Sequence, residues 1–248
     1  MKNNKLTETK IGTAKVIVDI VPKGYCIPNV KIKPTSITIH MTGNVGASAK
    51  NNHNYMKNIN KSGSRIASWH FTVDDKEIYQ AQSTNYKCYH AGCTSGNNTS
   101  IGIEIAMFND KARQLQAYKN AIELVKILMA YHKFDTSKVK RHYDWTKKDC
   151  PTWLISGKWG YNWTWFKNQL TTKSTTTTKP ATTNYIVKII YTGKEGLNIR
   201  QEPNTSSKIM GQVYENQAFT IVEEKNGFGR LKSGAGWISL NAKYVKKI

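Results

Sequence analysis

The chain has 248 residues, of which 39% are hydrophobic and 10% aromatic. This length suits two domains better than one, and the composition is typical of a globular protein rather than a disordered one. The net charge of +21, from 37 Lys and Arg against 16 Asp and Glu, attracts polyanions such as nucleic acids, anionic membranes and cell-wall polymers. No basic run is as long as a nucleic-acid-binding tail, so we do not expect a nucleic acid as the partner.

The start of the chain bears on where the protein acts. Residues 1–10 are polar and charged and lack the apolar region of a secretory signal peptide. No stretch approaches the roughly 20 apolar residues of a membrane span. We therefore expect synthesis in the cytoplasm, no membrane span, and a route to any external substrate that the sequence does not encode.

A threonine-rich segment predicts the domain boundary. Residues 171–184, TTKSTTTTKPATTN, contain no apolar residue beyond one alanine. Such a segment cannot contribute to a core and is typical of an extended linker. We expect a first domain over residues 1–170, this linker, and a second domain over residues 185–248.

The first domain mixes strand and helix patterns. In chain order, strands are expected at 35–41, at 69–73 and 78–82 as a hairpin, at 101–106 and at 139–142. A helix capped by Asn109 or Asp110 is expected to run to about His132, with an apolar stripe at spacings of three and four. A final helix is expected over 153–170. This order predicts an α/β domain with a mixed central β-sheet flanked by helices.

The second domain lacks a helical period. Short β-rich runs lie between turn residues such as Gly193, Asn204 and Gly234. Strands are expected at 185–191, 197–200, 209–213, 218–223, 227–232 and 236–239. In about 65 residues this spacing predicts a small all-β barrel.

Three features of the first domain carry possible chemistry. His40 lies on the polar side of an alternating strand, Glu104 is the charged residue of an isoleucine-rich strand, and His142 precedes Cys150 by eight positions. Two histidines and a cysteine would suit a catalytic zinc ion, which typically has three protein ligands and one open position. Spacing alone leaves the alternative open that each histidine is a hydrogen-bonded residue near the surface.

Five segments in order resemble the type 2 N-acetylmuramoyl-L-alanine amidases. The resemblance covers about residues 20–168, and the segments are ITIHMTG (37–43), SWHFTVDDKEIYQ (68–80), HAG (90–92), NNTSIGIEIAM (97–107) and RHYDWTKKDCP (141–151). It implies Zn²⁺ bound by His40, His142 and Cys150. It further implies Lys148 and Glu104 as catalytic residues, and bacterial peptidoglycan as substrate.

Trp69, His70 and His90 are expected to line the substrate site by the same resemblance. Trp69 departs from the pattern, because the phage lysozyme-amidases of this family have a Tyr there that contributes to catalysis. An indole N–H is a donor only and has no proton to transfer near neutral pH. The resemblance therefore implies that this role is absent or that Glu104 takes it over.

The segment TGKEGLNIRQEP, followed later by GWI (236–238) and Tyr244-Val245, resembles bacterial SH3 domains. These are small SH3-like barrels that commonly bind peptidoglycan, which implies a cell-wall-binding role. With no apparent signal peptide, the two resemblances together are typical of a phage endolysin, made in the host cytoplasm and acting on a Gram-positive wall. A host autolysin is the alternative, although most autolysins need an export signal.

Three rival interpretations remain. A non-catalytic peptidoglycan-binding protein would typically lack the metal ligands. A muramidase needs two carboxylates beside a glycosidic bond, and acidic residues are sparse in the first domain. A Cys/His peptidase would use Cys150 as a free thiolate nucleophile. Whether Cys88 and Cys93 pair, the oligomeric state and the ligand of the barrel are left open by the sequence.

Overall fold

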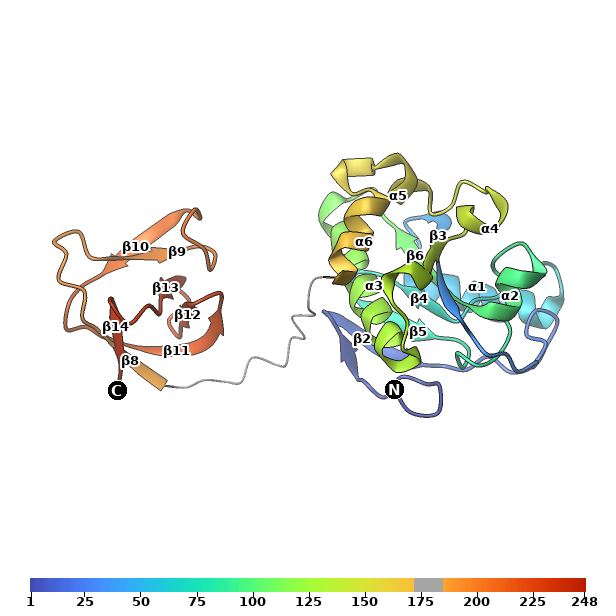
Figure 1. Cartoon of the computed structure of the whole chain (residues 1–248), viewed down its shortest axis with the longest axis horizontal. Coiled ribbons are helices and arrows are strands. Elements are labelled where there is room, and N and C mark those ends of the chain that lie inside the picture. Colours follow the sequence, from blue (N-terminus) through green and yellow to red (C-terminus); the bar gives the residue numbers. More distant parts are fainter. Residues whose placement is uncertain (172–184) are drawn as a thin grey trace. The chain divides into compact units, whose positions relative to one another are not determined.

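The computed structural model describes residues 1–171 and 185–248, so the predicted linker lies outside the described residues except for Thr171. The chain forms two compact units on either side of it (Figure 1). All four cysteines are described, and each is a free thiol. Among the described residues, no helix combines the length and apolar character needed to cross a membrane.

The first unit is built on a seven-stranded mixed sheet in the order β1-β2-β5-β4-β6-β3-β7. Strands β4, β6, β3 and β7 are parallel, and β5 pairs antiparallel with β4 as the predicted hairpin. The strands are β1 (Lys10–Ile11), β2 (Ala14–Val18), β3 (Ser36–Val45), β4 (Phe71–Val73), β5 (Glu77–Gln80), β6 (Ser100–Met107) and β7 (Val139–Arg141).

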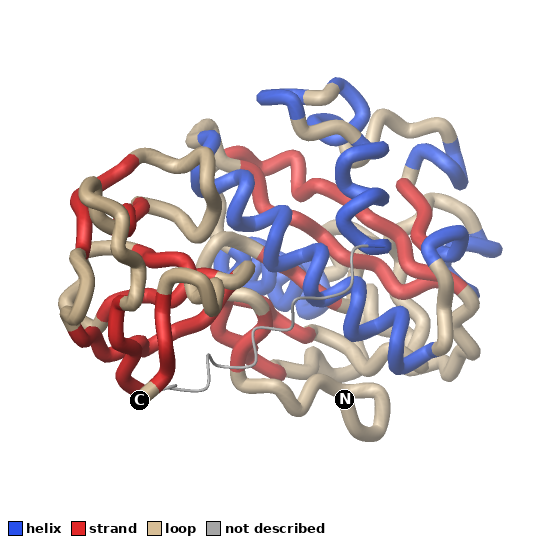
Figure 2. Tube along the Cα trace, turned by 60° about the vertical axis from the view of Figure 1, so that its left-hand side comes forward, coloured by secondary structure: helices blue, strands red, loops and turns tan. Residues whose placement is uncertain are grey.

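Helices surround this sheet (Figure 2). They are α1 (Ala49–Ser62), α2 (Thr94–Thr99), α3 (Lys111–His132), α4 (Tyr143–Thr146), α5 (Thr152–Ser156) and α6 (Trp163–Thr171), with 3-10 helices η1 (Thr136–Lys138) and η2 (Lys158–Gly160). Asp110 caps α3 by accepting a hydrogen bond from the backbone N–H of Arg113, which confirms one of the two predicted caps.

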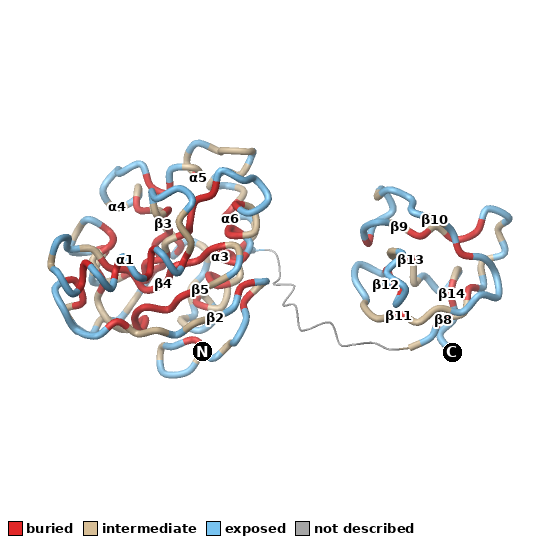
Figure 3. The backbone as a smooth tube through the Cα atoms, turned by 180° about the vertical axis from the view of Figure 1, so that it is seen from behind, coloured by how far each residue is buried: buried red, intermediate tan, exposed pale blue. Residues whose placement is uncertain are grey.

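The two faces of the sheet carry different side chains. Ile78 packs in the main core with α3 and α6, whereas its neighbour Tyr79 stacks on His53 of α1. Because successive strand residues point to opposite faces, α1 covers the face that α3 does not. Figure 3 shows buried residues gathered along the strands between these layers.

The predicted single helix over 153–170 is wrong in one respect. The segment is divided into α5, η2 and α6, with Trp159 at φ 58° inside η2. Gly157 and Gly160 also have positive φ, at 72° and 87°. Three left-handed residues in four positions cannot continue a right-handed helix.

Every regular element within residues 185–248 is a strand. Their order is β10-β9-β13-β12-β11-β8-β14, and all pairs are antiparallel around a separate apolar core. They are β8 (Tyr185–Ile189), β9 (Leu197–Arg200), β10 (Ile209–Val213), β11 (Ala218–Lys225), β12 (Phe228–Leu231), β13 (Trp237–Ser239) and β14 (Val245–Lys247). The small all-β unit is as predicted, and β14 adds one strand to the prediction.

Candidate metal centre and substrate pocket

The parallel pairing of β3 and β6 places two of the predicted site residues together. His40 of β3 lies in register with Glu104 of β6, and Glu104 in turn lies in register with Thr72 of β4. Residues in register on adjacent strands point to the same face. The three polar side chains therefore share the face opposite the isoleucine core.

The loop after β7 brings the other two predicted ligands to His40. The backbone N–H of His142 donates to the carbonyl of Ile39, 3.3 Å away, and the N–H of Tyr143 donates to the carbonyl of Cys150 at 2.9 Å. The first bond ties the loop to β3 beside His40. The second closes the loop, so that residues eight apart in sequence lie side by side.

Three donor atoms meet at this point. His40 Nδ1 lies 3.0 Å from His142 Nδ1 and 3.7 Å from Cys150 Sγ, and all three ligand atoms lie within 4.8 Å of one another. A tetrahedral zinc site with ordinary bond lengths holds such donors roughly 3.3 to 3.6 Å apart. The three residues are buried, their donor chemistry suits a zinc ion, and small side-chain adjustments would bring the donor atoms to these separations.

A chain of hydrogen bonds leaves Nδ1 of His40, the nitrogen that faces the other two donors, without a proton. His90 Nε2 lies 3.1 Å from the carbonyl oxygen of Ser100 and can only donate to it, so His90 Nδ1 is the acceptor. His40 Nε2 lies 3.0 Å from that Nδ1 and must donate. In neutral imidazoles the lone pair of His40 is then on Nδ1, where a metal ligand needs it.

The protonation states agree with this arrangement. Burial lowers the pKa of His90 to about 3 and that of His142 to about 4, and it lowers the pKa of His40 well below its usual value. All three histidines are therefore neutral near pH 7. Burial raises the pKa of the Cys150 thiol to about 12, so a bound cation would be needed to hold it as thiolate.

Glu104 has the features of a proton acceptor beside the donors. Its Oε2 is buried and has no hydrogen-bond partner among the described residues. Burial raises the pKa of Glu104 to about 7, although the charges of Lys148 and Arg65 act in the opposite direction. A carboxylate with such a pKa can both accept and return a proton near neutral pH.

The remaining predicted site residues differ in how they face the site. Lys148, Trp69 and His90 line the same cavity as the three donors. The Trp69 N–H donates to Thr72 Oγ1 at 2.7 Å, so its ring rather than its N–H is presented to the cavity. His70 is fully buried: its Nε2–H donates to the Tyr86 carbonyl, and its Nδ1 accepts from the Gly102 N–H.

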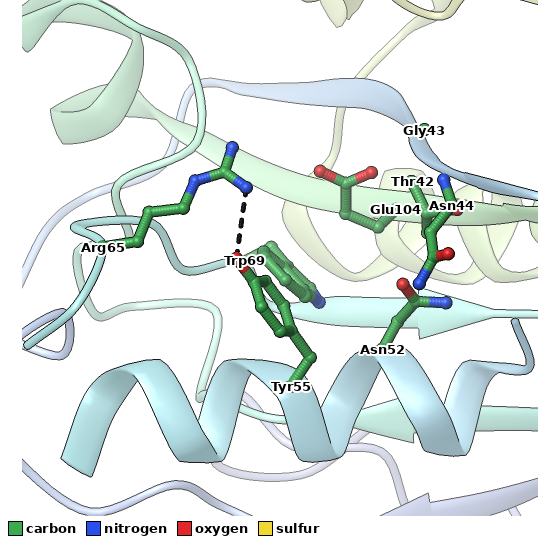
Figure 4. A pocket seen from close by; sticks show the side chains of 8 residues that line it. All are labelled: Thr42, Gly43, Asn44, Asn52, Tyr55, Arg65, Trp69 and Glu104. Atoms are coloured by element: carbon green, nitrogen blue, oxygen red, sulfur yellow. Dashed lines mark hydrogen bonds between the residues drawn. The ribbon is translucent and has the colours of Figure 1, made fainter. Parts of the chain in front are cut away.

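A second cavity of about 310 Å³ adjoins the donor cavity. Thr42, Arg65, Trp69 and Glu104 line both. Figure 4 shows the larger cavity between α1 and the strands, with Glu104 on one side of the Trp69 ring and Arg65 on the other. The residues that line only this cavity are Gly43, Asn44, Asn52 and Tyr55.

The four residues that line only the larger cavity were not predicted from the sequence, and neither was Arg65. Asn52 and Tyr55 belong to α1, a helix rich in Asn and Lys whose buried face includes the polar residues Asn52, His53 and Asn60. Ser48 at its N-cap and Gly63 at its C-cap are signals that would have located the helix. No motif would have assigned its residues to a cavity.

Comparisons with known proteins agree with the fold. Residues 31–153 match the family model described as N-acetylmuramoyl-L-alanine amidase, and residues 195–246 match the bacterial SH3 domain model. The chain is 41% identical over 145 residues to the N-acetylmuramoyl-L-alanine amidase XlyA of Bacillus subtilis, covering 56% of this chain and 47% of XlyA. It is 34% identical over 184 residues to CwlH of the same organism, an amidase by name, covering 70% of this chain and 69% of CwlH.

Solved structures show the same catalytic fold. The catalytic domain of XlyA superposes with a TM-score of 0.56 at 38% identity, covering 63% of this chain and 99% of that domain. A mutant endolysin from Bacillus subtilis gives a TM-score of 0.57 at 39% identity, with coverage of 63% and 99%. The chain spans about half the length of XlyA and of the B. subtilis amidase CwlA. The alignment covers 69% of CwlH at 34% identity, and residues 31–153 match the amidase family model. The chain therefore belongs to the N-acetylmuramoyl-L-alanine amidase family.

Proposed function

We propose that this chain is a zinc-dependent N-acetylmuramoyl-L-alanine amidase that cleaves the amide bond between N-acetylmuramic acid and L-alanine in peptidoglycan. The observation that supports this most directly is the meeting of His40 Nδ1, His142 Nδ1 and Cys150 Sγ within 4.8 Å, beside a buried carboxylate oxygen of Glu104 that has no partner in the described part of the chain. These are the parts that hydrolysis of an amide needs.

His40, His142 and Cys150 would hold the zinc ion. When bound, zinc lowers the pKa of a water molecule and polarises the scissile carbonyl. Two neutral imidazoles and one thiolate leave the centre a net charge of about +1. The protein's contribution is to keep both imidazoles neutral by burial and to orient His40 through His90.

Glu104 would transfer the proton, and Lys148 would stabilise the negative charge that develops. Glu104 takes the proton of the attacking water on its orphaned oxygen and returns it to the leaving nitrogen of L-alanine. Lys148, on the exposed loop between the two ligands, places a fixed positive charge toward the developing oxyanion. The Trp69 ring lines both cavities and would position the substrate by packing.

The rival use of Cys150 as a nucleophile has less support. Catalytic thiols have lowered pKa values because cationic or helix-terminal surroundings favour the thiolate. Burial instead raises the pKa of Cys150 to about 12. A thiol of this kind is inert without a bound cation, which favours a metal ligand.

The second unit would hold the enzyme on its substrate. The bacterial SH3 match supports a wall-binding role, and the charge of +21 favours anionic wall polymers. We propose that the protein acts on Gram-positive peptidoglycan as an endolysin.

Digestion of purified Gram-positive peptidoglycan tests the reaction. New N-terminal alanine and new reducing sugar are measured in parallel, with a zinc chelator and after zinc is returned. We expect alanine ends that disappear on chelation and reappear with zinc. New reducing sugar would instead mean a glycosidase, and wall binding without either product would mean a non-catalytic receptor.

A further inference from the structure

The two adjoining cavities divide the site into a reacting part and a second part. The smaller one contains the three metal donors and Lys148. The larger one contains none of the donors and extends toward α1 (Figure 4). Because Glu104 and Trp69 line both, a substrate whose scissile amide lies at the donors reaches the larger cavity directly.

Arg65 supplies a cation that lines both cavities. The side chain is exposed, and it forms no ion pair among the described residues. Within the described part of the chain, its one side-chain hydrogen bond is a long one, from Nη1 to the Tyr55 hydroxyl at 3.4 Å (Figure 4). Most of its guanidinium donors are therefore free for a planar anion such as a carboxylate.

Asn52 adds an acceptor whose direction is fixed. Its Nδ2 donates to the carbonyls of Ala47 and Ser48, at 3.3 and 2.9 Å. Both partners can only accept, so the amide nitrogen must occupy that position and Oδ1 faces the cavity. The cavity thus offers a cation, an apolar ring and an amide oxygen, which together suit a peptide with a carboxylate.

The charges of the substrate decide which part of it belongs here. Around the scissile bond the glycan is uncharged, because the lactyl carboxyl of the sugar is consumed in the amide. The nearest anionic group on the peptide side is the α-carboxylate of the second stem residue when that residue is D-glutamate. In many walls this carboxylate is replaced by a neutral carboxamide, so that a cation would distinguish the two forms.

Building on the proposed amidase function, we propose that the cavity formed by Tyr55, Arg65, Trp69 and Asn52 binds the stem peptide and that Arg65 selects a free carboxylate on its second residue. Arg65 is a specificity-determining residue in this assignment. It would contact the second stem residue, which follows the L-alanine whose amide bond is cleaved.

The test compares two soluble muramoyl peptides that differ only at the second residue, one with D-glutamate and one with D-isoglutamine. The intact chain is assayed as wild type, Arg65→Gln and Arg65→Lys. A hydrogen-bonded charge pair contributes about 1.5–3 kcal/mol, so we expect wild type to favour the carboxylate peptide about 10- to 100-fold in kcat/KM. Arg65→Gln should lose this preference by slowing the carboxylate peptide more than the carboxamide peptide, and Arg65→Lys should retain part of it.

Lys50→Gln is the matched control, because it also removes one positive charge. Lys50 is an exposed residue of α1 that does not line the cavity. This variant should leave the preference unchanged. Equal slowing of both peptides by Arg65→Gln, or no preference in wild type, would overturn the assignment.

Failure of the amidase function is distinguishable from failure of this assignment. If wild type hydrolysed neither peptide, the proposed reaction would be wrong. Calorimetric titration of the same two peptides would still decide the role of the cavity: tighter binding of the carboxylate form supports it, and equal affinity excludes it.

Discussion

His90 is placed to orient a ligand of the proposed metal site without touching the metal itself. Its ring connects the carbonyl of Ser100 to His40 Nε2, and its backbone N–H donates to Asn97 Oδ1 at 2.9 Å. Hydrogen bonds thus hold both the ring and the backbone of His90 in place. The predicted contact of His90 with substrate and this orienting role make different experimental predictions.

We expect His90→Phe to weaken zinc binding about 10- to 100-fold, as loss of an outer partner of a ligating histidine typically does. The reason is that His40 Nε2–H loses its acceptor and the tautomer is no longer fixed. Competition with a chromogenic chelator measures the zinc affinity. If zinc affinity stayed at the wild-type value while KM rose, His90 would be a substrate contact instead.

Lys148 is expected to act on the reaction and not on the metal. Replacement by Gln should lower kcat about 100- to 1,000-fold, the usual cost of removing one oxyanion-stabilising group, and should leave the zinc content unchanged. Lys147→Gln removes the same charge one position earlier, at a residue that does not line the donor cavity, and should have little effect. Loss of zinc in the Lys148 variant, with normal rate once zinc is restored, would contradict this role.

At the scale of elements, β6 is shaped by what lies on its polar face. Gly102 alternates with isoleucines that are all buried, and a Cβ built on it would lie 2.6 Å from His90 Cγ. The backbone of Gly102 also bonds His70 in both directions, through its N–H and its carbonyl. The glycine therefore gives the His90 ring the space it occupies beside His40.

Gly102→Ala should destabilise the fold by about 1–3 kcal/mol, as overpacking in a core typically does, and should weaken zinc binding because His90 is displaced. Gly211→Ala is the control, since a Cβ there meets only Ile199 Cδ1 at 3.8 Å. Urea unfolding and chelator competition on both variants check this. Wild-type values for both quantities in Gly102→Ala would show that the ring can move without consequence.

The sequence predicted the elements that carry regular patterns and failed where contacts depend on three-dimensional placement. Alternation predicted the strands around His40 and Glu104, because burial of one face imposes it. The division of the 153–170 segment was missed because the aromatic pattern hid the effect of Gly157 and Gly160. Arg65 was missed because an exposed arginine in a loop has no distinguishing pattern before the fold brings it to a cavity.

The candidate metal donors are a different case. His40, His142 and Cys150 were predicted through the family resemblance, and spacing alone left a surface histidine as a reasonable alternative. The structure brings the three together because β3 and β7 are neighbours and the loop after β7 closes on itself. Such a meeting of residues 102 and 110 positions apart follows from topology, which the local pattern does not contain.

At the scale of the whole molecule, each unit has an apolar core of its own with no residue in common. We therefore expect a chain that ends at Thr171 to fold and to hydrolyse soluble muramoyl peptides at the rate of the full chain. On insoluble wall at nanomolar enzyme it should be slower by at least about 10-fold, because a tethered binding unit raises the local enzyme concentration. Equal rates on both substrates would mean that the second unit does not bind the wall.

The exposed position of Arg65 has a consequence for how such an enzyme can change over generations. The metal donors are buried and held by several backbone bonds, whereas Arg65 lies on the surface and makes a single long bond to Tyr55. A substitution at Arg65 therefore costs little folding free energy, while most substitutions at the donors would abolish activity. If Arg65 selects between wall chemistries as proposed, single substitutions at this position would change that preference and leave the hydrolytic centre intact.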